Sequence, residues 1–344
     1  MSKNENASGG NGTGSRHGFR KFLKILLLLI LALALAAYII PLTETVSESE
    51  LRAADSENWM GKLDGGMPLS DLVIPGTHDS ATQYVRLAFF FKCQAASIRQ
   101  QLEAGYRYLD IRLELKEDRF RLIHGFASCG TGALPWADRL YLEDVLEQCY
   151  GFLEANPTET VLFAVKQEHG DASVAEFETA LAAVVRQNPD RWLLTDRIPT
   201  LDEARGKLVL LRRYEDAAGL GAESGVPMLW PDQKGHEDVS QNLEMIDNGS
   251  YQLYVQDRFE YSTEDKWAAF TAGLNGQPAQ SGSALFLHFL STRGSVSLLG
   301  HPYHFAKILN AKLAELPASA LNGWIVVDFA TAPLAEHIYS SNFR

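Results

Sequence analysis

The sequence contains little cysteine and too little positive charge to balance its acidic residues, and both shortages restrict what the protein can be. Its three cysteines, Cys93, Cys129 and Cys149, permit at most one internal disulfide, and no Cys-x-x-Cys or Cys/His spacing suggests a zinc site. The formal net charge of −12 argues against a nucleic-acid partner, because phosphate binding requires concentrated positive charge. It also argues against broad electrostatic adhesion to anionic lipid, so any membrane contact should be local.

A long apolar run occurs near the N-terminus. Residues 22–42 have about the length that a helix needs to cross a bilayer, with basic residues before them and acidic residues after them. By the positive-inside rule we expect residues 1–21 to be a cytoplasmic, disordered, basic tail, residues 43–56 a linker, and the remainder extracytoplasmic. Alanines within the run also allow a cleaved signal peptide. The sequence therefore leaves open a membrane-anchored protein and one that is secreted after signal cleavage.

Residues 57–344 contain eight short runs typical of β-strands, separated by longer helical or irregular stretches. The runs are Leu72–Ile74, Tyr108–Leu113, Phe120–Ile123, Thr160–Val165, Leu208–Leu211, Tyr251–Val255, Leu285–Phe289 and Trp324–Val327. Strands that alternate with helices indicate parallel βαβ units, and eight of them predict an α/β fold of the (β/α)8 TIM-barrel type. Because only a tight turn fits between the second and third runs, we expect an irregular barrel.

Polar or charged residues stand at the end of every run. They are His78 and Asp79, Asp110 and Arg112, His124, Lys166, Arg213, Asp257, His288 and Asp328. Taken alone, each is better explained as a satisfied core group or as a charge in solvent than as a catalytic residue. In a barrel, however, the carboxyl ends of the strands converge on one mouth, and we expect the active site there.

The residue types at this mouth narrow the chemistry. Two histidines with carboxylates to orient them can supply a general base and a general acid near neutral pH. Arg112, Lys166 and Arg213 can stabilise an anionic oxygen, and planar guanidinium groups suit phosphate. No carboxylate cluster has metal-like spacing, so we expect cationic side chains to act in place of a divalent ion, without a cofactor. The residues indicate metal-independent transfer at a phosphodiester through a cyclic phosphate.

Several segments resemble the bacterial phosphatidylinositol-specific phospholipases C and occur in the order that this family has. They are Pro-Gly-Thr-His-Asp-Ser (75–80), Tyr-Leu-Asp-Ile-Arg (108–112), Leu-Ile-His-Gly (122–125), Gly-Lys-Leu-Val-Leu-Leu-Arg-Arg-Tyr (206–214), Leu-Trp-Pro-Asp (229–232), Val-Gln-Asp (255–257) and Ile-Val-Val-Asp-Phe (325–329). The resemblance implies an irregular TIM-type barrel that cleaves phosphatidylinositol, or a glycosylated form, to diacylglycerol and inositol 1,2-cyclic phosphate.

The resemblance also implies roles for individual residues. His78 would be the general base that takes the proton of the inositol 2-hydroxyl, and Asp328 would orient it. His124, assisted by Asp79, would be the general acid that protonates the leaving diacylglycerol oxygen.

Arg112, supported by Asp110, would stabilise the charge on the phosphoryl oxygens. Other residues match positions that contact the inositol or lie near its pocket in that family: Lys166, Arg213, Asp232, Asp257, Trp230 and Phe259. Phe259 departs from the family pattern, since it stands where the bacterial enzymes typically have a tyrosine. It keeps an apolar ring but lacks the hydroxyl.

Two alternatives remain open from the sequence. A glycerophosphodiester phosphodiesterase-like barrel would need carboxylates that bind a divalent cation. A catalytically inactive lipid- or glycan-binding module would bind its ligand without turnover. The partner that we expect is a membrane containing phosphatidylinositol, or a glycosyl-phosphatidylinositol, and we expect a monomer that does not bind nucleic acid.

Overall fold

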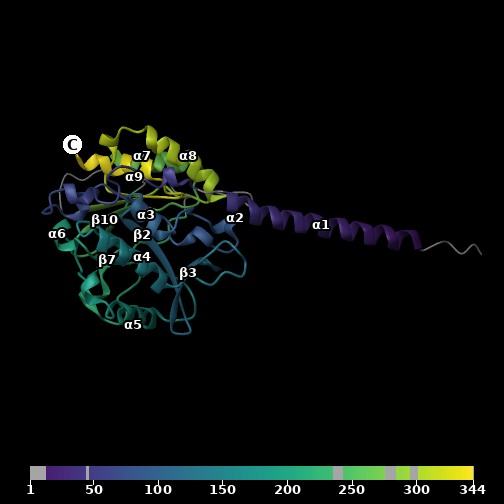
Figure 1. Ribbon diagram of the computed structural model, residues 1–344, viewed down its shortest axis with the longest axis horizontal. Coiled ribbons are helices and arrows are strands. Elements are labelled where there is room, and N and C mark those ends of the chain that lie inside the picture. Colours follow the sequence, from purple (N-terminus) through teal and green to yellow (C-terminus); the bar gives the residue numbers. More distant parts are fainter. Residues whose placement is uncertain (1–12, 44–45, 235–242, 276–283, 295–300, 344) are drawn as a thin grey trace, which may run out of the picture.

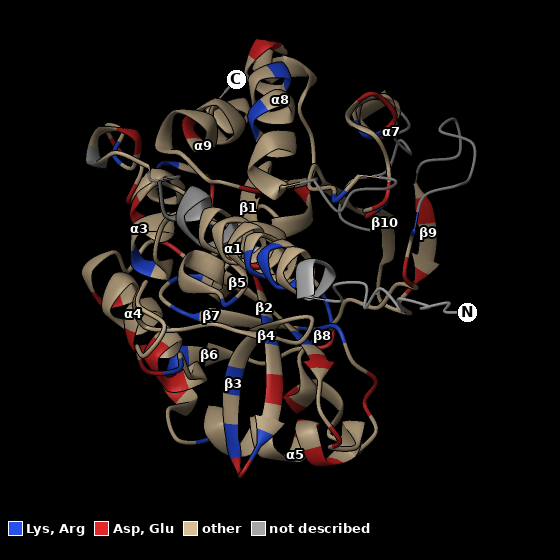
Figure 2. Ribbon diagram, turned by 90° about the vertical axis from the view of Figure 1, so that its right-hand side faces the viewer, with Lys and Arg blue, Asp and Glu red and all other residues tan. Residues whose placement is uncertain are grey.

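The structure is a computed structural model of the chain that describes residues 13–43, 46–234, 243–275, 284–294 and 301–343. Helix α1 (Thr13–Thr43) projects from the rest of the chain and meets it beside α2 (Ala88–Phe91), as Figure 1 shows. Large apolar side chains of α1 between Phe19 and Leu35 are exposed, and its basic residues lie toward its N-terminal end (Figure 2). Within the described ranges, no helix is both long and apolar enough to cross a membrane.

The start of α1 corrects part of the prediction for the N-terminus. Residues 13–21, expected to be disordered, form the first turns of α1, whereas residues 1–12 lie outside the described part of the chain. Helix growth is cooperative, because each residue added to an existing helix gains a hydrogen bond at little further entropic cost. The apolar run therefore extends the helix toward the N-terminus. The membrane role of residues 22–42 stays a prediction.

Strands and helices alternate along the rest of the chain. The strands are β1 (Ile74–Thr77), β2 (Tyr108–Lys116), β3 (Arg119–His124), β4 (Ala127–Ser128), β5 (Val161–His169), β6 (Trp192–Leu193), β7 (Leu208–Arg212), β8 (Val226–Pro227), β9 (Glu244–Asp247), β10 (Gln252–Gln256), β11 (Ala284–Phe289) and β12 (Trp324–Val327). Beyond α1 and α2, the helices are α3 (Ile98–Glu103), α4 (Leu142–Ala155), α5 (Val174–Val185), α6 (Leu201–Ala204), α7 (Thr263–Asn275), α8 (Pro302–Glu315) and α9 (Ala332–Tyr339). Each of the eight predicted runs overlaps a strand, and the α/β class is confirmed.

The strands form one curled sheet. Its path is β6-β7-β5-β2-β1-β12-β11-β10-β9, and along it only the β10–β9 pair is antiparallel. β1 and β12 are neighbours, in register from Ile74 beside Trp324 to Thr77 beside Val327. Adjacency of the first and last parallel strands is the arrangement of a barrel. Figure 1 shows α7, α8 and α9 on one side of the sheet, with α4 and α5 on the other.

The described residues do not form a closed eight-stranded barrel, and this corrects the prediction of a (β/α)8 barrel. The third predicted run, β3, pairs antiparallel with β2 and turns away from the parallel sheet. The outer edge of β7 is shared by the two-residue strands β6 and β8, so neither offers a long ladder. Among the described residues no ladder joins β8 to β10, and the sheet stays open there. A tight hairpin turn, Lys116–Arg119, leaves no room for the crossover helix that a parallel β3 would need.

Alternate residues of the central strands enter two different cores. In β5, Leu162 and Ala164 face the inside of the curl, whereas Val161, Phe163 and Val165 pack outward against α4 and α5. Successive side chains of a strand point to opposite faces, and a parallel sheet covered by helices is buried on both of them. The even-numbered residues of β2 and β5 are therefore aimed into the curl, and this decides which side chains reach its mouth.

Candidate active site

The alternation along the strands brings the predicted polar residues to one place. Asp110 and Arg112 share the inner face of β2 with Tyr108, and Lys166 shares that of β5 with Leu162. Arg213 follows β7 directly, and its side chain has the same inward direction as Val209 and Leu211. Together these side chains line or underlie a cavity of about 600 Å³ at the carboxyl ends of the strands.

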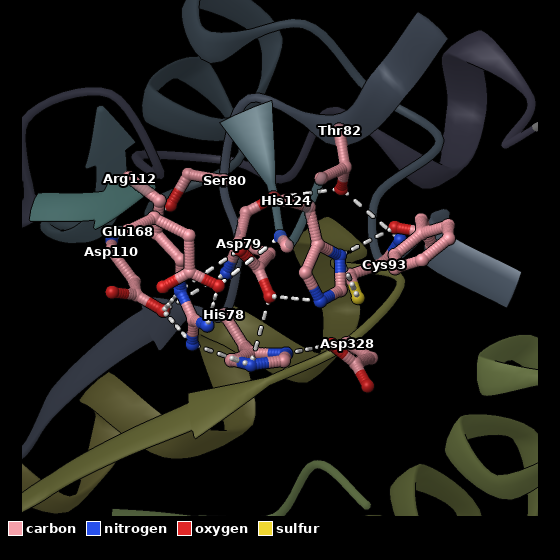
Figure 3. A network of polar contacts seen from close by, with 12 residues as sticks. His78, Asp79, Ser80, Thr82, Cys93, Asp110, Arg112, His124, Glu168 and Asp328 are labelled. Carbon is pink, nitrogen blue, oxygen red and sulfur yellow. Dashed lines mark hydrogen bonds and ion pairs between the residues drawn. The ribbon is translucent and has the colours of Figure 1, made fainter. Parts of the chain in front are cut away.

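His78 directly follows β1. Its ring lies between Arg112 and Asp328 in the polar network (Figure 3). Its Nδ1 is 2.8 Å from Oδ1 of Asp328, and its Nε2 is 3.1 Å from Oδ2 of Asp79 and 3.0 Å from Nη2 of Arg112. Burial lowers the pKa of His78, but the negative charges of Asp79 and Asp328 outweigh it and raise this pKa to about 9. The contact with Asp328 assigns the Nδ1 proton and leaves Nε2 as the nitrogen that faces the cavity.

Asp79 adopts an unusual backbone conformation, with φ of 43°. Aspartate tolerates this left-handed region better than most residues, although it still costs free energy. The turn directs the buried carboxylate of Asp79 back toward the two histidines, so that Oδ2 lies 3.1 Å from His78 Nε2 and 3.2 Å from His124 Nε2. One carboxylate oxygen therefore lies within reach of both imidazoles.

The guanidinium of Arg112 is held by three carboxylates. Its Nε is 2.9 Å from Asp79, its Nη2 is 3.0 Å from Asp110, and its Nη1 is 3.2 Å from Glu168. Burial opposes ionisation of Asp110, but the charges of Arg112 and Arg213 hold the pKa of this carboxyl well below its usual range. Arg112 therefore stays charged and fixed in orientation next to His78.

His124 ends β3 and faces acceptors with both of its ring nitrogens. Nδ1 is 2.8 Å from the carbonyl oxygen of Phe91, and Nε2 is 3.2 Å from Asp79 Oδ2. An imidazolium that carries both protons satisfies both acceptors, whereas neutral imidazole can donate to only one of them. The surroundings of His124 thus suit a proton donor, in contrast to those of His78 Nε2, which also faces the Arg112 donor.

A second group of predicted residues lies beside the catalytic network. Cζ of Arg213 lies 3.8 Å from the centre of the Trp230 ring, and Nη1 of Arg213 is 3.1 Å from Oδ1 of Asp110. Nε1 of Trp230 donates to Oδ2 of Asp257 over 3.0 Å. Of the twelve predicted site residues nine line the cavity, namely His78, His124, Arg112, Asp328, Lys166, Arg213, Asp232, Asp257 and Phe259. Asp79, Asp110 and Trp230 lie behind them and contact them.

Sequence reasoning assigned no role to Glu168 or Cys93. Glu168 contacts Arg112, accepts from the backbone N–H of Gly125 and lies 3.1 Å from Lys166, so it connects β5 with the His124 loop. Its spacing of two residues from Lys166 was the available signal, since both lie on the inner face of β5. Cys93 Sγ lies 3.9 Å from His124 Nδ1, and burial raises the pKa of its thiol well above the usual range. No local pattern points to Cys93.

His288, which also ends a predicted run, does not line the cavity. It is fully buried, its Nε2 lies 3.2 Å from Oδ1 of Asn322, and burial lowers its pKa to about 4. The surroundings keep it neutral and structural.

Ligand-type atoms for a metal do occur in the network. Those of Asp79, Cys93 and His124 lie within 4.8 Å of one another, and so do those of His78, Cys93 and Asp328. In a third such set, His78, Asp79 and Asp110, both carboxylates already contact the permanently charged Arg112. The donor set therefore holds a guanidinium where a divalent cation would otherwise balance the charge.

Comparison with known proteins agrees with this architecture. Residues 67–214 match the family model of the phosphatidylinositol-specific phospholipase C X domain. A 1-phosphatidylinositol phosphodiesterase of Staphylococcus aureus strain NCTC 8325 is 28% identical over 328 residues, which cover 90% of this chain and 94% of that protein. The phosphatidylinositol-specific phospholipase C of S. aureus, in a variant form, superposes with a TM-score of 0.70 at 23% identity, over 85% of this chain and 99% of that one. The Listeria monocytogenes enzyme superposes with a TM-score of 0.62 at 24% identity, over 83% and 98%.

Proposed function

We propose that this chain, which belongs to the phosphatidylinositol-specific phospholipase C family, cleaves the phosphodiester of phosphatidylinositol, or of a glycosylated form, without a metal ion. The observation that carries the proposal is the arrangement around Asp79. Its Oδ2 lies within 3.2 Å of the Nε2 atoms of both histidines, and its Oδ1 contacts Arg112. A base, an acid and a permanent positive charge thus meet at one cavity, as proton transfer at a phosphodiester requires.

In the proposed reaction, Nε2 of His78 takes the proton of the inositol 2-hydroxyl. The resulting oxygen attacks phosphorus in line, and Arg112 stabilises the charge that develops on the phosphoryl oxygens. The bond from phosphorus to the glycerol oxygen breaks, and Nε2 of His124 gives that oxygen its proton. The products are diacylglycerol and inositol 1,2-cyclic phosphate, which water opens in a slower second step with the roles of the histidines reversed.

The neighbouring carboxylates orient these groups. The Nδ1 contact with Asp328 keeps His78 in the tautomer whose Nε2 can accept a proton, and Asp79 lies against His124. Asp110 holds Arg112 through Oδ2 and Arg213 through Oδ1, so one carboxylate fixes two cations. We assign headgroup binding to Lys166, Arg213, Asp232 and Asp257, with Trp230 supporting Arg213 and Phe259 offering an apolar face to the inositol ring.

We also propose where the protein is located and in which oligomeric state it acts. The exposed apolar side chains of α1 and its junction beside α2, whose Phe90 and Phe91 line the cavity, support a domain held near lipid. The alternative location is outside the cell, after cleavage of this apolar segment as a signal peptide. We propose that the catalytic part acts as a monomer.

Phosphorus NMR tests the reaction directly. Incubation of residues 57–344 with phosphatidylinositol micelles and EDTA should produce the signal of a five-membered cyclic phosphate, and His78→Ala should remove it. Absence of turnover with EDTA, together with turnover when calcium is added, would contradict the metal-free mechanism. A folded protein that is silent under both conditions but binds the micelles would instead be a binding module.

The pH dependence of kcat/KM should report the proton on His78. A base must be neutral to act, so with a pKa raised to about 9 the rate should rise with pH, reach half of its plateau near pH 9 and level off above it. Asp328→Asn removes a charge that favours protonated His78, so the pKa falls and the ascending limb moves to lower pH, by about 1 unit. The plateau should fall as well, because orientation of the ring is lost. If the ascending limb of the pH profile of kcat/KM does not move in Asp328→Asn, this limb does not report the protonation of His78.

A further inference from the structure

Gln94 is fully buried and uses its whole side-chain amide at the ends of two strands. Its Nε2 donates to the carbonyl oxygen of His78 over 2.9 Å and to that of Val327 over 3.0 Å. Its Oε1 accepts from the backbone N–H of Ala330 over 3.0 Å. Every one of these partners is backbone, and each belongs to or flanks the segments that carry His78 and Asp328.

These bonds lie where the regular ladder between β1 and β12 ends. The register runs to Thr77 beside Val327, and one further bond, from His78 N–H to Val327 O, follows over 3.0 Å. His78 and Asp328 come directly after this point, so their separation is no longer set by strand pairing. The Gln94 side chain continues the connection between the two strands beyond this ladder. Its single Nε2 donates both to the carbonyl oxygen of His78, directly after β1, and to that of Val327 in β12.

The same segment also holds the turn that follows Asp328. Phe329 has a left-handed φ of 51°, and its N–H donates to the carbonyl oxygen of Cys93 over 2.7 Å. The N–H groups of Cys93 and Gln94 both donate to Oγ1 of Thr82, each over 3.1 Å, and this hydroxyl donates to the Asp79 carbonyl over 2.7 Å. Residues 93–94 are thereby connected to both halves of the catalytic network.

We propose that Gln94 is a positioning residue for the proposed cleavage: its amide keeps the backbones of His78 and Asp328 at the separation that their 2.8 Å hydrogen bond requires. The proposal rests on the proposed function for its kinetic readout. Gln94 does not line the cavity, so it acts through His78 and Asp328 rather than on the substrate.

Gln94→Met tests this, because methionine has nearly the same size and removes all three bonds. We expect kcat to fall about 10- to 100-fold while KM changes by less than about twofold, since misplacement of a base affects the chemical step rather than binding. In NMR of the ligand-free protein, the titration of the His78 imidazole should move to lower pH as its contact with Asp328 weakens. The side chain of Gln94 contacts none of Asp79, Arg112 and Asp110, the other charged groups around His78, so we expect them to stay in place.

Asn342→Leu is the matched control at the opposite end of β1. Asn342 accepts from the N–H of Val73 and donates to its carbonyl, both over 2.8 Å, far from the cavity. We expect it to lower the melting temperature as Gln94→Met does, but to leave kcat and the His78 titration unchanged. Should Gln94→Met not fold, Gln94→Asn, which is too short to span both carbonyls, replaces it.

The outcomes separate the two proposals. A wild-type protein without turnover would remove the proposed function, yet the NMR titration would still decide whether Gln94 controls His78. If a Gln94 variant loses only thermal stability, with kcat and the titration as in wild type, Gln94 is structural and the inference is wrong.

Discussion

Replacement of His124 by alanine should lower kcat for phosphatidylinositol by about 10²- to 10⁴-fold, the usual contribution of a positioned general acid. Without the imidazolium, the glycerol oxygen must leave as an alkoxide, which is a poor leaving group. His124 is suited to prevent this, since both of its nitrogens face hydrogen-bond acceptors and its Nε2 lies beside the Asp79 carboxylate. Steady-state kinetics with micellar substrate measures the loss.

The same variant can be separated from a general loss of structure by changing the substrate. An inositol phosphodiester with a nitrophenol leaving group needs no protonation, so His124→Ala should regain most of the wild-type rate with it. His78→Ala is the matched control, because the 2-hydroxyl still has to lose its proton whichever group leaves. Equal rescue of both variants, or of neither, would contradict the assignment of acid and base.

Glu159→Gln should lower the free energy of unfolding by about 3–5 kcal/mol, because it leaves a fully buried guanidinium without its counter-ion. Glu159 and Arg107 are both completely buried, with Oε2 2.8 Å from Nη2. Nη2 of Arg107 also donates to the carbonyl oxygens of Ser56 and Glu57, and Nη1 donates to those of Leu102 and Tyr106. The second Glu159 oxygen accepts from the N–H of Gly61, so this pair joins the N-terminal segment to the sheet. Urea denaturation of the wild type and the variant gives the difference.

An exposed ion pair provides the control for this effect. Glu203 pairs with Arg197 at the surface, so Glu203→Gln should change the free energy of unfolding by no more than about 1 kcal/mol. Arg107 and Glu159 precede β2 and β5, at the end of the sheet away from the cavity. Folded Glu159→Gln should therefore keep the wild-type kcat. A loss no larger than that of Glu203→Gln would show that the buried pair adds nothing to stability.

The local sequence predicted the strands well, for a physical reason. A run such as 160–165 is apolar on both faces, which is typical of a parallel strand covered by helices, and the alternation of side chains decides which charged residues point into the curl. Asp110, Arg112 and Lys166 could thus be placed on one face before any contact was known. The spacing in the sequence equally contained Glu168, two residues beyond Lys166.

Closure of the sheet could not be predicted in this way. The eight runs counted for a barrel include β3, which pairs antiparallel, and omit β8, whose two residues are too few to show a period. Whether β8 reaches β10 depends on loop contacts between distant segments. A count of apolar runs contains no information about them.

The sequence by itself determined the succession of strands along the chain, the faces on which their charged residues lie and the kinds of group available at the mouth. These follow from periodicity between near neighbours and from side-chain chemistry. Only the tertiary structure decided which groups meet: His78 and Asp328 are 250 positions apart, yet 2.8 Å separates them. The raised pKa of His78, the fixed orientation of the Arg112 guanidinium and the hydrogen bonds of Gln94 all depend on contacts between residues that are distant in the sequence. Electrostatic and hydrogen-bond energies fall steeply with distance, so chemistry of this kind is set when the chain folds.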